Sequence, residues 1–126
     1  MSQDEDRRRY QTGRHLGGFL LLLVAMRADH GASLIERLRG LQAPPLTVDT
    51  GRVYRALRTL EREGALSSTW TVADGEQPVR VYRLTPAGRE RLDREAAEIR
   101  ARRDGLDRFL AMWRELGGDA GPEPGP

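Results

Sequence analysis

The sequence predicts a mainly α-helical fold with a small β wing, and two adjacent segments predict it. Residues 50–62 divide at helical spacing into an apolar face and a basic face. The apolar face contains Val53, Ala56, Leu57 and Leu60, and the basic face contains Gly51, Arg55, Arg58 and Arg62. Glu63-Gly64 ends this helix, and segments 65–72 and 79–84 then alternate as two strands around the polar turn 73–78. A basic helix backed by a hairpin is typical of a winged helix-turn-helix.

The composition limits the kinds of site that the chain can hold. The 126 residues are 38% hydrophobic, which suits one small domain and favours further burial at a subunit interface. All 21 basic residues are arginine and the net charge is only +2, so any cationic surface must be local. The chain lacks cysteine, which excludes disulfides and thiolate metal sites, and its two histidines have no metal-ligand spacing. We expect no cofactor and no metal.

The apolar run Phe19–Met26 is too short to cross a bilayer. A small-residue cleavage site at the right distance, as in a signal peptide, does not follow it. We therefore expect a cytoplasmic protein without a membrane partner.

The first elements form the body of the predicted domain, residues 15–85. Residues 1–14 are polar and predict a flexible or weakly helical arm, whose arginines reach a DNA groove or are simply solvated. Leu16–Ala28 is apolar almost all round, which predicts a helix that is buried on most sides and partly faces a partner subunit. Ala32–Leu41 forms the next helix, and Thr47 or Asp49 caps the basic helix.

The last helix is predicted over residues 86–116, because Thr85-Pro86 supplies a hydroxyl cap followed by proline. Its apolar residues follow alternating steps of four and three along the seam Leu92, Ala96, Ile99, Leu106, Leu110 and Trp113, with Arg103 in the missing place. A heptad seam needs a second helix to cover it, so this is the predicted dimerisation helix. Residues 117–126 have the composition of a disordered tail.

With these residues laid out, the chain resembles the PadR family of bacterial transcriptional regulators, in its small subclass with a single C-terminal helix. The resemblance is carried by TGRVYRALRTLEREGAL, by VYRLTPAGRERL and by His30-Gly31. Two positions differ from the family pattern. Ala32 stands where a tyrosine usually follows His-Gly, which affects how the first two helices pack. Val79-Arg80 stands where a basic pair is common, which predicts a weaker grip of the wing on DNA.

The resemblance implies a homodimeric winged-helix repressor. It implies that the first and last helices of two subunits pack together, and that a pocket near this interface takes an effector. Known effectors of the family include phenolic acids and hydrophobic drugs. We expect interface side chains on both helices, namely Leu20, Leu23, Leu92, Ile99, Leu106, Phe109, Leu110 and Trp113. Trp113 and Phe19 are the candidate effector-pocket residues, although a tryptophan on such a seam is more often simply core.

Candidate DNA contacts lie on the basic helix and the wing. They are Gly51, Arg52, Tyr54, Arg55, Arg58, Thr59 and Arg80. Arginine forks suit guanine edges and phosphates. The ring of Tyr54 either bonds a phosphate or is half-buried. Arg80 alternates with Val79 and Val81, so it is exposed if those two are buried. Trp70 is expected to pack on the domain body.

The acids at the wing tip argue against deep entry of the wing into a DNA groove, because Asp74 and Glu76 repel phosphates. The sequence contains no nucleophile–base pair, phosphate-cradling loop or carboxylate dyad, so an enzyme is not expected. An alternative is a protein-interaction module that acts through the heptad helix without specific DNA binding, but the arginine cluster on the basic helix disfavours it.

Overall fold

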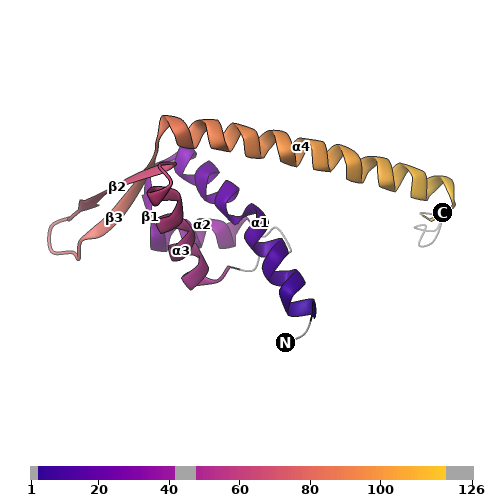
Figure 1. Ribbon diagram of the computed structural model, residues 1–126. Coiled ribbons are helices and arrows are strands. Elements are labelled where there is room, and N and C mark those ends of the chain that lie inside the picture. Colours follow the sequence, from indigo (N-terminus) through magenta and orange to yellow (C-terminus); the bar gives the residue numbers. More distant parts are fainter. Residues whose placement is uncertain (1–2, 42–47, 119–126) are drawn as a thin grey trace, which may run out of the picture. The chain divides into compact units, whose positions relative to one another are not determined.

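The computed structural model describes residues 3–41 and 48–118. The order of elements is α1 (Gln3–Met26), β1 (Asp29–His30), α2 (Gly31–Gly40), α3 (Thr50–Arg62), β2 (Leu66–Thr71), β3 (Val79–Leu84) and α4 (Pro86–Glu115), as Figure 1 shows. The chain divides into two units, Met1–Asp93 and Arg94–Pro126. The predicted class is confirmed: the protein is mainly helical with a small antiparallel sheet.

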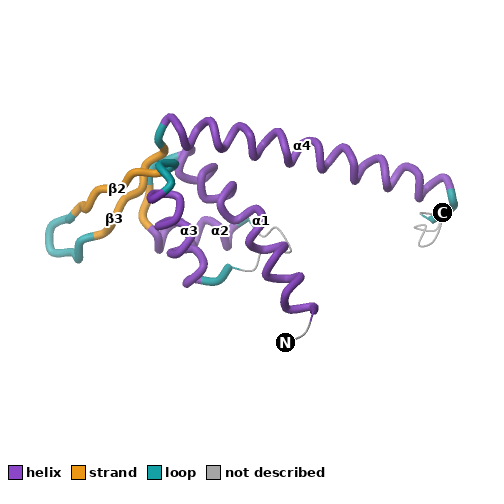
Figure 2. Tube along the Cα trace, in the orientation of Figure 1, coloured by secondary structure: helices purple, strands orange, loops and turns teal. Residues whose placement is uncertain are grey.

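The sheet of the first unit has three strands in the order β1-β3-β2. β2 and β3 form the predicted hairpin, with Leu66 opposite Leu84 and Thr71 opposite Val79, and Figure 2 shows this hairpin in orange around its turn. β1 was not predicted, because two residues are too few for strand alternation to be visible. It pairs with β3 through Asp29 opposite Tyr82 and His30 opposite Val81, so it ties the α1–α2 corner to the wing.

The core of the first unit lies between the three helices and the base of the hairpin. It consists of Leu16, Leu20, Leu21, Leu23, Val24, Leu34, Ile35, Leu38, Val53, Leu57, Leu60, Ala65, Leu66 and Tyr82. The apolar underside of α3 is therefore buried as predicted. Full burial of one leucine side chain is worth roughly 1.5–3 kcal/mol, so these contacts hold α3 firmly against the body.

Two residues of α1 that were expected at a subunit interface lie inside this core. Leu20 is 0% exposed and Leu23 is 4% exposed. Other parts of the same chain cover them, because α2, α3 and the sheet pack around this turn of α1. The large apolar side chains that α1 leaves exposed are Leu22 and Met26. These two side chains, rather than Leu20 and Leu23, are the ones available to a partner.

The backbone of the expected N-terminal arm is helical from Gln3 onward and continues into α1. The sequence predicted an arm that is either flexible or weakly helical, and the structure shows a helical backbone there. The mobility of residues 1–14 stays a prediction. The expected disordered tail falls largely on residues 119–126, which lie outside the described residues. None of the helices in the described ranges is long and apolar enough to span a membrane.

The end of α3, the wing and the start of α4 meet at Thr85. Gly64 takes a positive φ of 84° after α3, a conformation that favours glycine. The Thr85 hydroxyl donates to the Gly64 carbonyl at 2.6 Å and accepts from the Gly88 N–H at 2.9 Å, so it caps α4 as predicted. A side chain at Gly88 would overlap the Ala65 carbonyl. The glycine therefore permits the close approach of α4 to the strand entry.

The apolar residues of α4 differ between its two parts. Leu92, in the first unit, is partly buried against the core. In the second unit Ile99, Leu106, Phe109, Leu110 and Trp113 are all exposed, with Leu106 at 59% and Trp113 at 39%. The ring of Trp113 lies against Gly118, where a side chain would overlap it. Gly117, two residues after the end of α4, has a positive φ of 83°.

Candidate nucleic-acid interface

The α3 helix presents one face to solvent along its length. Asp49 begins the helix by accepting a hydrogen bond from the Arg52 N–H at 3.2 Å. With Val53, Leu57 and Leu60 buried, the opposite face exposes Gly51, Arg55 and Arg58, while Arg52 and Thr59 are half-buried. The structure therefore brings together, on α3, all the helix residues that the sequence singled out.

The arginines of this face differ in their partners. No carboxylate of the described residues lies within ion-pair distance of Arg55 or Arg58. The guanidinium of Arg55 lies above Gly51, where a Cβ would meet its Nη1 at 3.3 Å. The Thr59 hydroxyl accepts a hydrogen bond from Arg62 at 3.3 Å. Two cationic forks are thus presented outward, which suits an anionic partner.

Tyr54 lies at the flank of the face and packs on the first residue of α2. A Cβ at Gly31 would overlap its ring, yet the side chain is still 38% exposed. The structure therefore gives Tyr54 a packing role, and its hydroxyl stays a predicted phosphate contact. This contact also explains why glycine follows His30: any larger residue would displace the Tyr54 ring.

Arg80 of the wing lies on a different face from the one expected. Arg80 is exposed, but not because Val79 and Val81 are buried: the buried residue of β3 is Tyr82, and Val79 is exposed. Arg80 therefore shares the core-side face of the hairpin with Tyr82 and Leu84.

The Arg80 guanidinium already has partners within the same chain. Its Nε donates to the Ser68 hydroxyl at 2.7 Å, and its Nη2 lies 3.5 Å from the carboxylate of Glu61. The Ser68 hydroxyl in turn donates to Glu61 at 2.6 Å. Arg80 thus links the wing to α3.

The prediction that Trp70 packs on the domain body is wrong. Trp70 is 65% exposed, and the Arg80 guanidinium lies 5.7 Å from its ring centroid. Both residues sit on the core-side face and are paired across the strands. The hairpin, however, extends beyond the helices, as Figure 1 shows. The face of β2 that is buried at Leu66 is therefore exposed at Trp70, because the core does not extend that far along the hairpin.

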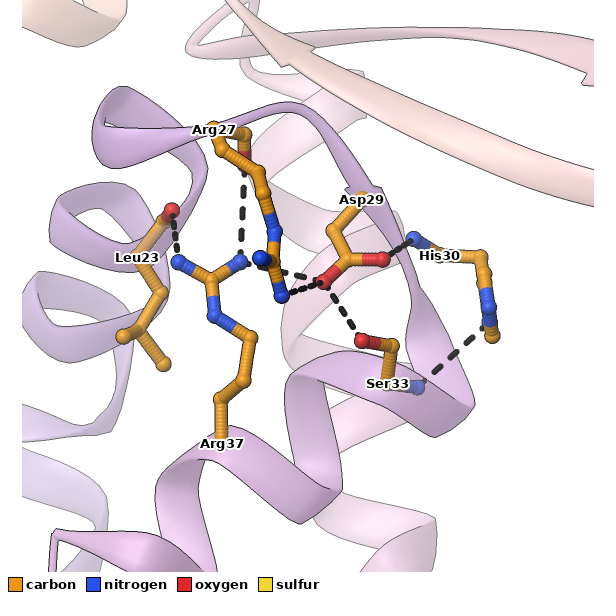
Figure 3. Close-up of polar contacts among 6 residues, drawn as sticks. All are labelled: Leu23, Arg27, Asp29, His30, Ser33 and Arg37. Carbon is orange, nitrogen blue, oxygen red and sulfur yellow. Dashed lines mark hydrogen bonds and ion pairs between the residues drawn. The ribbon is translucent and has the colours of Figure 1, made fainter.

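A polar cluster around Asp29, drawn in Figure 3, holds the α1–α2 corner behind this surface. The Asp29 carboxylate accepts from the Ser33 hydroxyl at 2.6 Å and from the His30 N–H at 2.9 Å, and it pairs with Arg37 at 3.1 Å. Arg37 also donates to the Leu23 carbonyl at 2.8 Å. His30 caps α2 by accepting from the Ser33 N–H at 3.4 Å. This cluster was not predicted, because nothing in the sequence distinguishes Arg37 from a surface arginine.

Two groups near the site have shifted pKa values. Burial raises the pKa of Asp29, but hydrogen bonds from Ser33, His30 and Arg37 and the charge of Arg37 outweigh it, so the pKa lies below the ordinary 3.8. Burial raises the pKa of the Tyr82 phenol above 10.0, against the opposing charge of Arg80. The Asp29 cluster is thus an ionised support, and Tyr82 is neutral. Among the described residues no group of acids and histidines could hold a metal ion.

Comparison with known proteins identifies the family of this chain. A family model described as the transcriptional regulator PadR-like family matches residues 20–94, more than half of the chain. The chain belongs to the PadR family of transcriptional regulators. Members of this family are regulators rather than enzymes. The matched residues include α2, α3, the wing and the capped start of α4.

Individual relatives agree with the family. The chain is 44% identical over 77 residues to transcriptional regulator Rv3488 of Mycobacterium tuberculosis, a match that covers 58% of this chain and 66% of that protein. It therefore spans just under two thirds of that relative.

Solved structures show the same fold. A PadR family regulator from Eggerthella lenta DSM 2243 aligns with a TM-score of 0.68 and 25% identity, covering 83% of this chain and 86% of that one. A PadR-like regulator from Bacillus cereus strain ATCC 14579 aligns with a TM-score of 0.68 and 18% identity, covering 81% and 95%.

The Asp29 cluster predicts how stability depends on pH. The folded pKa of Asp29 is depressed, so its contribution is present above the unfolded pKa of about 3.9 and is lost as pH falls through the folded pKa. Asp29→Asn should lower the free energy of unfolding by roughly 1–3 kcal/mol at pH 7, with the difference from the wild type shrinking below pH 4. Urea unfolding at several pH values measures this.

Asp93→Asn is the matched control, because the Asp93–Arg89 pair is exposed on one helix. It should change stability by less than about 0.5 kcal/mol. Parallel pH profiles for the wild type and Asp29→Asn would contradict the assigned role of the cluster.

Proposed function

We propose that this PadR family protein is a homodimeric repressor that binds a specific DNA sequence through α3. The observation that carries the proposal is the outward face of α3, where Arg55 and Arg58 are exposed opposite a fully buried underside. A helix held in this way can lie in the major groove, where arginine forks bind guanine edges or phosphates. Gly51 adds no side chain to the first turn, where the Arg55 guanidinium lies over it.

The homodimer is supported by the apolar seam of α4. Within the second unit the side chains of Leu106, Phe109 and Leu110 are exposed, and Leu106 and Leu110 lie on the heptad seam. An exposed seam of this kind is stabilised when a second helix packs on it. Two copies of α3, about one DNA turn or roughly 34 Å apart, would then read successive major grooves.

We also propose that a small flat effector releases the protein from DNA. It rests on Trp113, an aromatic ring that remains 39% exposed at the seam. Phe19, the second residue expected in the effector pocket, is half-buried against the core of the first unit. Such a ligand would act by changing the distance between the two α3 helices of the dimer. It would regulate DNA binding only if its affinity differed between the dimer with the DNA-binding distance and the dimer with the altered distance.

Because a DNA-binding regulator must reach the chromosome, we infer a cytoplasmic location.

The competing function is a protein-interaction module that uses the α4 seam without specific DNA binding. A mobility shift with the DNA upstream of its own gene, repeated at several salt concentrations, decides between the two. Specific, salt-dependent binding supports the repressor, and absence of binding to this DNA and to random DNA supports the module.

The seam predicts that a charge at its centre breaks the dimer. Leu106→Glu should convert the dimer to a monomer, because it would bury an unpaired carboxylate between two helices. Light scattering at micromolar concentration measures the mass. Ala101→Glu, which adds the same charge off the seam, should remain dimeric. A monomeric wild type would refute the dimer.

The exposed face of α3 predicts a specific loss of affinity. Arg55→Ala should weaken binding to the operator by roughly 1–3 kcal/mol and relax preference at one base position, if Arg55 reads a base. A uniform loss across all sequences would instead assign Arg55 to a phosphate. Fluorescence anisotropy with operator and random duplexes measures both. Unchanged affinity on both duplexes would mean that α3 docks differently.

The effector hypothesis predicts a fluorescence response from Trp113. In a Trp70→Phe background Trp113 is the one remaining tryptophan, so planar aromatic compounds should quench its emission and weaken DNA binding. Trp113→Ala should abolish the effect on DNA binding and keep the dimer. If Trp113→Ala dissociates the dimer and no aromatic compound changes the fluorescence, Trp113 is structural and the effector hypothesis fails.

A further inference from the structure

A cleft opens between α3 and the wing of the first unit. Its volume is about 360 Å3, and its lining includes His30 from β1, Tyr54 and Arg58 from α3, and Trp70, Arg80 and Tyr82 from the wing. α3 and the hairpin that form its two sides are both visible in Figure 1. The cleft combines aromatic rings with two guanidinium groups. It therefore suits a partner that is anionic but also has apolar surface.

The exposed Trp70 is the feature that the fold itself does not explain. A tryptophan that is 65% exposed leaves a large apolar area in water, and tryptophan is the residue type most enriched among energetically important interface contacts. The ring is not loose: Arg80 lies over it at 5.7 Å, and Arg80 is itself held by Ser68 and Glu61. Because these contacts order the indole in advance, a partner would lose little entropy by packing on it.

The charges of the cleft select the partner. The Arg80 charge is balanced by Glu61, whereas no described carboxylate lies within ion-pair distance of Arg58. At the far end of the hairpin, Asp74 and Glu76 are exposed and would repel phosphates. Attraction for an anion is therefore concentrated at the base of the wing, beside α3, rather than at the tip.

We propose that this cleft seats one strand of the DNA backbone, with the Trp70 indole packed on a deoxyribose and Arg58 paired with an adjacent phosphate. The proposal rests on the proposed function, since the same DNA must lie against α3. Arg80 is a positioning residue here: it orients the Trp70 ring and ties the wing to α3. The wing thus grips DNA through an apolar contact at its base.

Affinity at two classes of duplex tests the contact. Sugar contacts carry no base information, so Trp70→Ala should weaken binding to operator and random DNA by the same factor, roughly 5- to 30-fold. Trp70→Phe, which keeps a ring, should retain most of the affinity. Thr71→Ala is the matched control, because Thr71 lies one residue along β2 on the opposite face and is also exposed. It should bind as the wild type does.

Salt dependence separates the two proposed contacts. Arg58→Ala should reduce the slope of log affinity against log salt by about 0.9, the value for one phosphate. Trp70→Ala should leave the slope unchanged, because the indole carries no charge. A loss confined to operator DNA would overturn the sugar contact in favour of base reading by Trp70.

Fluorescence supplies a readout that does not depend on the folding of Trp70→Ala. In a Trp113→Phe background, Trp70 reports alone, and duplex DNA should shield it from acrylamide. If the wild type binds DNA while Trp70 stays fully accessible and Trp70→Ala loses no affinity, the cleft is overturned and the proposed function stands. If the wild type binds no DNA, the proposed function fails and the cleft proposal falls with it.

Discussion

The arrangement of the first unit depends on one hydroxyl group. Thr85 donates to the Gly64 carbonyl that follows α3 and accepts from the Gly88 N–H that begins α4. Thr85 also directly follows β3, and its N–H bonds the Ala65 carbonyl at 3.2 Å. The α3 helix, the wing and the first turn of α4 are therefore joined at a single residue. The ion pair of Glu63 with Arg91 at 3.2 Å adds a second link between α3 and α4. None of the three elements can rotate without breaking one of these bonds.

Local signals were enough to predict most of the elements. The two faces of α3, the glycine after it, the hairpin and the Thr85-Pro86 start of α4 all depend on neighbouring residues, and all were found. The predictions that were wrong or missing concern which residues are covered by distant parts of the chain, because tertiary packing decides this. Strand alternation shows that Trp70 and Arg80 share a face, but not where the core beneath that face ends. The apolar Leu16–Ala28 run shows burial, but not whether Leu20 and Leu23 are covered by their own protomer. β1 exists only because β3 lies beside it.

The arginines show why a candidate site is harder to predict than a fold. Arg37 supports Asp29, Arg91 pairs with Glu63, and Arg80 is held by Glu61. These three arginines form ion pairs that link elements of the first unit. Arg55 and Arg58 have no acidic partner within ion-pair distance among the described residues. In the sequence all five look alike, because the acidic partners of three of them lie 8 to 28 residues away along the chain. Only the folded chain separates structural arginines from those available to a ligand.

The exclusive use of arginine also has a consequence for the control of this protein by covalent modification. Acetylation of lysine removes a positive charge and is a common way to weaken binding to a polyanion. No side chain in the sequence carries a primary amine, so this route is closed. Guanidinium groups also keep their proton at every physiological pH. The cationic face of α3 therefore has a constant charge, which neither the acidity of the cell nor its acetyl-group donors can change.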